Sequence, residues 1–110
     1  MSKNLASDVR TYGAMVDSLH LYDESLEVSN VLVWREGLHE DLRNGASLGP
    51  DDRVLLEQAD TKLVALRGLI VRRFPEVFEA NADIPRKLWW WHLDKGPQVR
   101  EEAGAAARKP

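Results

Sequence analysis

The feature that most constrains the fold is a regular spacing of apolar residues across a long stretch without proline. From about Ser7 to Asn44 there is no proline, and apolar side chains return every third or fourth residue. This spacing is typical of a core-facing helix or a coiled-coil seam. The apolar positions are Leu5, Val9, Tyr12, Val16, Leu19, Leu26 and Val33. Asp23 and Asn30 interrupt the stripe, so either the helix breaks near Tyr22-Asp23 or both lie in the seam; we expect one long helix.

A second helix is predicted from Pro50 to Arg73. Proline suits the first position of a helix, and Asn44-Gly45 ends the preceding one because glycine accepts left-handed backbone angles. Pro75 prevents further continuation. The seam of this helix consists of Leu56, Ala59, Leu63, Leu66 and Ile70. The six-residue connection between the two helices predicts an antiparallel hairpin.

This hairpin leaves apolar surface without cover. At about 1.5 Å per residue the first helix spans roughly 55 Å and the second roughly 36 Å, so that Val9, Tyr12 and Val16 overhang. Val31 to Trp34 also covers about 300° of helix surface, which calls for burial on two sides. We therefore expect an all-α protein in which two long hairpins complete a four-helix bundle by self-association. The alternative is a monomer in which the C-terminal helices fold back over the surplus surface.

Two short helices and a tail are predicted after the hairpin. They run from Pro75 to Asn81 and from Arg86 to Asp94, and Gly96-Pro97 ends the second. The remaining residues are mostly Ala, Glu, Arg, Gly and Lys, with almost nothing to bury. The sequence therefore predicts a single helical domain over residues 1–96 and a mobile tail over 97–110.

Composition excludes several classes of function. The 110 residues include no cysteine, which excludes disulfides, thiolate metal sites and cysteine nucleophiles. No phosphate-binding glycine loop or nucleophile elbow occurs. The net charge of −3 provides no overall basic field for nucleic acid or anionic lipid. The apolar runs are too short to span a bilayer, and Met1 to Asn4 does not begin a signal peptide, so we expect a cytoplasmic protein without membrane association.

Three consecutive tryptophans mark the most informative segment, from Arg86 to Lys95. On a helix the three rings point about 100° apart, so apolar groups surround it. Tryptophan is enriched in protein interfaces, and we expect this helix to dock into a groove of its own bundle or of a partner. The alternative is that all three rings complete the core of the monomer. The residues predicted at a partner contact are Trp89, Trp90, Trp91, Trp34, Phe78 and Arg86.

A second pattern suggests a metal site. Glu36 and His39 lie one helical turn apart, the spacing used in di-iron bundles. Asp17 and His20 repeat the spacing and Glu24 continues that face, so two paired chains could bind iron, manganese or zinc. The two motifs are about 28 Å apart along an unbroken helix, which argues against one shared site. Charge pairs on a solvated face explain the same residues.

The sequence thus favours a small non-enzymatic subunit or adaptor that binds protein, as a homo-oligomer or within a larger complex. One alternative is an oligomeric, metal-binding helical bundle. Another is a helical subunit of a nucleoprotein complex, in which bases stack on the tryptophans beside Arg86, Lys87 and Lys95. No motif requires a catalytic residue or a cofactor.

Overall fold

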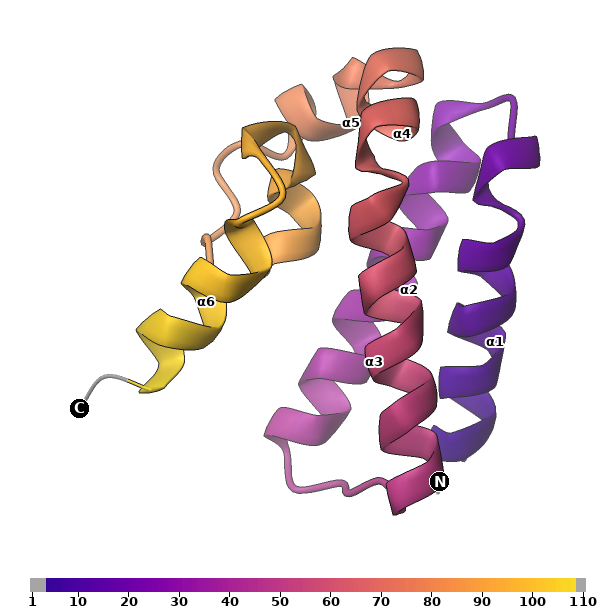
Figure 1. Ribbon diagram of the computed structural model, residues 1–110, viewed down its shortest axis with the longest axis vertical. Coiled ribbons are helices and arrows are strands. Elements are labelled where there is room, and N and C mark those ends of the chain that lie inside the picture. The colour runs from indigo at the N-terminus through magenta and orange to yellow at the C-terminus, as the bar shows by residue number, and fades with distance from the viewer. Residues whose placement is uncertain (1–3, 109–110) are drawn as a thin grey trace.

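The computed structural model describes residues 4–108, and this part of the chain folds into helices joined by short turns (Figure 1). The prediction of an all-α fold is confirmed. In chain order the helices are α1 (Leu5–Asp17), the 3₁₀ turn η1 (Leu19–Leu21), α2 (Ser25–Arg43), α3 (Pro50–Ala65), α4 (Arg67–Arg73), α5 (Pro75–Ala80), the 3₁₀ helix η2 (Trp89–Lys95) and α6 (Val99–Arg108).

The first predicted helix is broken in two. α1 ends at Asp17, a 3₁₀ turn follows, and the backbone is extended at Tyr22 and Glu24 before α2 begins. The Glu27 carboxylate accepts hydrogen bonds from the backbone N–H groups of Asp23 and Glu24, at 3.2 and 3.3 Å, and so stabilises the new helix start. The prediction of one continuous helix is wrong, and the alternative of a break near Tyr22-Asp23 is correct.

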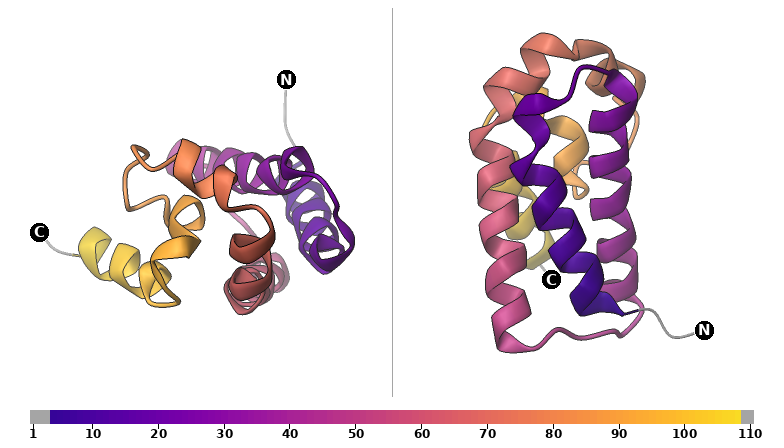
Figure 2. Two further views of the ribbon diagram at one scale, coloured as in Figure 1. Left: turned by 90° about the horizontal axis from the view of Figure 1, so that it is seen from above. Right: turned by 90° about the vertical axis from the view of Figure 1, so that its right-hand side faces the viewer.

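This break places the N-terminal apolar stripe inside the chain's own core. α1 and α2 run antiparallel, and α3 then returns in the direction of α1 (Figure 2). α1 packs along α3 and also against α2. Val9, Tyr12 and Val16, which would overhang in a simple hairpin, are therefore buried. The hairpin becomes an up-down-up arrangement of α1, α2 and α3, while the four-helix bundle of two copies stays a prediction.

The C-terminal half of the chain covers the opposite side of α2 and α3. α3 bends at Leu66, whose N–H is shared between the carbonyls of Lys62 and Leu63, so the second predicted helix is also divided. α5 forms close to where it was predicted. The tryptophan segment is a 3₁₀ helix where an α-helix was expected, and Gly96 ends it as predicted, with a φ of 121°.

A further helix, α6, forms where the sequence predicts a mobile tail. It packs against η2 and buries Val99 and Ala103, which lie one turn apart. This pair was missed because two small apolar residues among alanine, glutamate and arginine give a weak periodic signal. Residues 1–3 of the predicted domain and 109–110 of the predicted tail lie outside the described residues.

Candidate partner-binding surface

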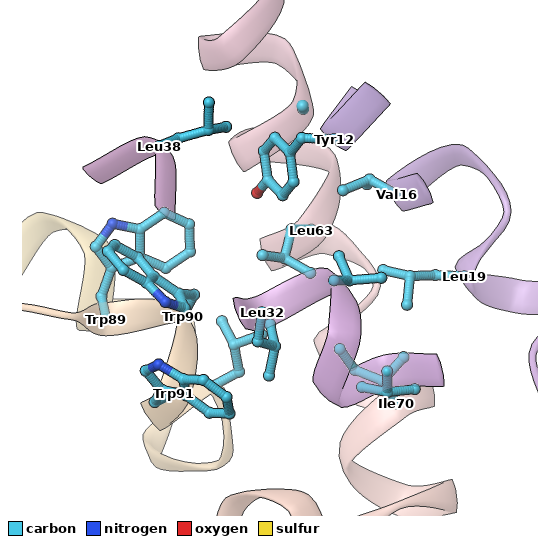
Figure 3. Close-up of a cluster of buried hydrophobic side chains, with 14 of the residues drawn as sticks. Tyr12, Val16, Leu19, Leu32, Leu38, Leu63, Ile70, Trp89, Trp90 and Trp91 are labelled. Atoms are coloured by element: carbon cyan, nitrogen blue, oxygen red, sulfur yellow. The ribbon is translucent and has the colours of Figure 1, made fainter. Parts of the chain in front are cut away.

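The three tryptophans of η2 lie in the core of the chain itself. Trp89, Trp90 and Trp91 are buried and face side chains from α1, α2 and α3 in Figure 3. Phe78 of α5 is buried as well. This burial matches the alternative in which all three rings complete the core of the monomer, and a partner contact through these residues stays a prediction. The rings offer no free face on which nucleic-acid bases could stack, and Arg86 remains exposed at the edge of the segment.

Polar contacts fix the tryptophan segment in this position. The Trp91 indole N–H donates to the Glu36 carboxylate of α2 at 2.7 Å. Arg67 Nε donates to the Leu93 carbonyl, also at 2.7 Å. The His92 ring nitrogen Nε2 lies 2.6 Å from the Ile84 carbonyl and ties the preceding loop to the helix. Together these contacts give η2 one defined orientation between α2 and α4.

A buried ion pair joins α2 to α3 beneath the tryptophans. Arg35 Nε and Nη2 donate to the two oxygens of the Asp60 carboxylate, at 2.9 and 3.1 Å. The Tyr12 hydroxyl of α1 donates to the same carboxylate at 2.8 Å. Burial, and to a lesser degree Asp60, raise the pKa of Tyr12 well above its ordinary value, so the hydroxyl stays protonated and keeps donating. One carboxylate thereby connects all three long helices.

The C-terminal segment completes this cluster from the other side. The Arg35 guanidinium lies over the Trp90 ring, 4.6 Å from its centroid. Arg100 of α6 pairs with Glu57, lies 3.9 Å from the Asp60 carboxylate and is 5.6 Å from the Trp89 ring centroid. A guanidinium over an indole face is favourable, more so when water is excluded. The cluster therefore holds the C-terminal segment against the three long helices.

The residues of the metal hypothesis are dispersed. Asp17 pairs with Lys62 at 2.6 Å, His20 is exposed at η1, and Glu24 precedes α2. Glu36 accepts a hydrogen bond from the Trp91 indole N–H, and the centroids of the His39 and Trp90 rings are 5.5 Å apart. Within residues 4–108, no group of three or more His, Asp or Glu side chains is placed to hold a metal ion.

His39 also has an environment that disfavours its charged form. Burial, reinforced by the nearby Arg35 guanidinium, lowers the pKa of the imidazole below its ordinary value. The ring is thus neutral at pH 7 and packs against Trp90. This arrangement gives His39 a role in packing the tryptophan layer.

Apolar surface between α1 and α2 stays uncovered, as it does at Leu21, Leu26, Val54 and Leu55. Val33 is 57% exposed and Trp34 is 39% exposed, although both follow directly on the buried Val31 and Leu32. Beside them lies a pocket of about 560 Å³. We call this pocket and its rim the α1–α2 groove; it is lined by Asp8, Met15, Asn30, Val33, Trp34, Gly37, Leu38 and Asp41. Trp34 is thus the one predicted contact tryptophan with an accessible ring face.

The groove is held in shape by its own side chains. The Trp34 indole N–H donates to the backbone carbonyl of Asp8 at 3.0 Å, which orients the ring across from α2 to α1. Gly37 lies near the middle of α2, and a Cβ atom there would meet nothing within 4 Å. The groove therefore combines a fixed aromatic ring with an open stretch of helix backbone.

Only some of these features have a signal in the sequence. The apolar belt Val31 to Trp34 predicted burial on two sides of α2, but the structure buries only Val31 and Leu32 and leaves Val33 and Trp34 exposed. Arg35 and Asp60 were not predicted as a buried pair, because they are 25 residues apart and each lies beside an apolar seam. The sequence signal for this pair is the position of each charged residue next to an apolar seam, because charged side chains are buried almost only when they are paired.

Comparison with known proteins adds no assignment: no family model, curated protein or solved structure matches the chain. Among residues 4–108, none of the helices combines the length and the hydrophobicity that a membrane span requires. The described residues thus form an all-helical fold with a tryptophan-containing core and an uncovered apolar groove between α1 and α2.

Proposed function

We propose that the chain is a small non-enzymatic assembly subunit or adaptor whose protein partner docks on the α1–α2 groove. The observation that carries this proposal is the exposure of Val33 and Trp34 beside a pocket of about 560 Å³. Tryptophan is enriched among the residues that dominate binding energy at protein interfaces.

The fixed Trp34 ring supports the proposal. Its hydrogen bond to the Asp8 carbonyl orients the indole before a partner arrives, so less rotamer freedom is lost on binding. The remaining predicted contacts, Trp89 to Trp91 and Phe78, support binding indirectly, because they hold α2 in place from the core side.

Site-specific photo-crosslinking in native cells tests this function. Val33 is replaced with the photoreactive amino acid p-benzoylphenylalanine, and Val54 on α3 serves as the matched control because it is 54% exposed and lines no part of the groove. We expect a discrete protein adduct from position 33 that is absent from position 54 and is lost when Trp34→Ala is added. An adduct between two copies of the chain would show self-assembly through this face. The same faint pattern from both positions would refute the proposal.

A further inference from the structure

A second pocket, of about 490 Å³, lies where the chain turns from α2 into α3. Its apolar lining consists of Leu42, Leu48 and Leu56, and its polar lining includes Arg35 and Arg53. The volume falls in the range of about 300–1,000 Å³ that is usual for small-molecule sites, which combine apolar walls with a few polar groups. We call it the α2–α3 pocket; it shares no lining residue with the α1–α2 groove and is therefore a separate candidate site.

Arg35, which lines this pocket, has a hydrogen-bond donor without an acceptor. Its side chain is only 9% exposed, and its Nε and Nη2 donate to the Asp60 carboxylate. The third nitrogen, Nη1, is buried and has no hydrogen-bond partner within the described residues. The Asp60 carboxylate already accepts three hydrogen bonds, two from Arg35 and one from the Tyr12 hydroxyl. A buried charged donor without an acceptor costs free energy, so an acceptor bound in the pocket would stabilise this arrangement.

Arg53 provides a second guanidinium group without a counter-charge. Its side chain is exposed and forms no ion pair with any residue from 4 to 108. Glu57, which also lines the pocket, is paired with Arg100 of α6. The lining residues and their ion-pair partner therefore carry three guanidinium groups, of Arg35, Arg53 and Arg100, and two carboxylates, of Glu57 and Asp60. One positive charge is left without compensation.

We propose that the α2–α3 pocket binds a small organic monocarboxylate. A carboxylate is planar and has two acceptor oxygens, which match the donor geometry of the guanidinium groups of Arg53 and Arg35. A single negative charge balances the excess positive charge, whereas a dianion such as phosphate is repelled more strongly by the two carboxylates of the pocket. The apolar body of the ligand packs against the three leucines, which provide the contact that an inorganic anion lacks.

Titration with sodium octanoate, followed by two-dimensional ¹H–¹⁵N NMR, tests the proposal. We expect the backbone signals of Ser47 and Leu48 and the Nε–Hε signal of Arg53 to shift until the pocket is saturated. Octanamide, which has the same shape without the charge, should bind about tenfold more weakly, and inorganic phosphate should bind more weakly than octanoate. Arg53→Gln should raise the dissociation constant of octanoate about fivefold. Arg10→Gln, the matched control, removes an exposed arginine outside the pocket and should change this constant less than twofold.

Several outcomes would overturn the proposal. Equal binding of octanamide would show that the charge is not recognised, and equal binding of phosphate would show that the organic part is not. Unchanged affinity in Arg53→Gln, or no saturable shift with octanoate, would exclude the α2–α3 pocket as the site. Trp34→Ala should leave octanoate binding intact, and a loss there would place the ligand in the α1–α2 groove. None of these results depends on the photo-adduct at position 33, so this proposal and the proposed function are tested separately.

Discussion

Replacing Asp60 with asparagine should remove a large part of the stability of this fold. The carboxylate is buried and accepts hydrogen bonds from Arg35 Nε, Arg35 Nη2 and the Tyr12 hydroxyl. Asparagine preserves the shape but leaves the Arg35 guanidinium buried without a counter-charge, which typically costs about 3–5 kcal/mol. The total free energy of unfolding of a domain of this size is about 5–15 kcal/mol. At about 4 °C per kcal/mol, the melting temperature should fall by about 12–20 °C.

Urea unfolding followed by circular dichroism measures this effect. Arg35→Met should cost less than Asp60→Asn, because Asp60 keeps the Tyr12 hydroxyl and has Arg100 at 3.9 Å. The triple variant Tyr12→Phe, Arg35→Met, Asp60→Leu should recover much of the loss, since it removes every polar group that would be left unpaired. A loss below about 1 kcal/mol in Asp60→Asn, or a triple variant less stable than the single, would refute the reasoning.

Three further predictions follow from single contacts. Trp90→Ala should lose about 3–5 kcal/mol in urea unfolding, because the buried indole is packed from several sides; a loss below about 1 kcal/mol would contradict its place in the core. The Gly37→Ala variant should have a free energy of unfolding about 0.5–1 kcal/mol higher, since a Cβ there meets open space. The Gly96→Ala variant should have one about 1–2 kcal/mol lower, because the φ of 121° at Gly96 disfavours a side chain. Thermal unfolding of both variants checks the pair, and two shifts of the same sign would contradict it. The pKa of His39 is lowered in the folded chain, so the folded state binds fewer protons than the unfolded state. The contribution of His39 to the free energy of unfolding is therefore complete above the unfolded pKa near 6.5 and is lost as the pH falls below that value. His39→Gln should therefore flatten the loss of unfolding free energy on acidification, and an unchanged slope would show that His39 does not titrate differently in the two states.

Local features of the sequence predict much of the helical framework. The stop at Gly45, the start at Pro50 and the short helix at Pro75 follow from backbone preferences that act within a few residues. The break before α2 was one of two alternatives, because Asp23 interrupts the apolar stripe there, but one continuous helix was the stated expectation. The signal was the acidic pair Glu24 and Glu27 three residues apart, the spacing at which the second carboxylate reaches back to the start of the helix.

The arrangement of the site depends on contacts between distant parts of the chain. Periodicity shows that the tryptophan segment needs burial on all sides, but it does not say which surface buries it. The decisive contacts join Arg35 to Asp60 and Trp91 to Glu36, which are 25 and 55 residues apart. The belt Val31 to Trp34 predicted burial on two sides of α2, whereas the orientation of the helix buries Val31 and leaves Trp34 exposed at the groove.

The most direct test of the proposed function is a two-dimensional ¹H–¹⁵N NMR titration of the four indole N–H signals with the protein captured by crosslinking at position 33. Trp34→Phe assigns the signal of the exposed ring. We expect the Trp34 signal to shift in proportion to bound partner, while the signals of Trp89, Trp90 and Trp91 keep their positions because these rings stay in the core. A shift of the three core signals with Trp34 unchanged would contradict the proposed function and would show that the tryptophan segment itself forms the contact.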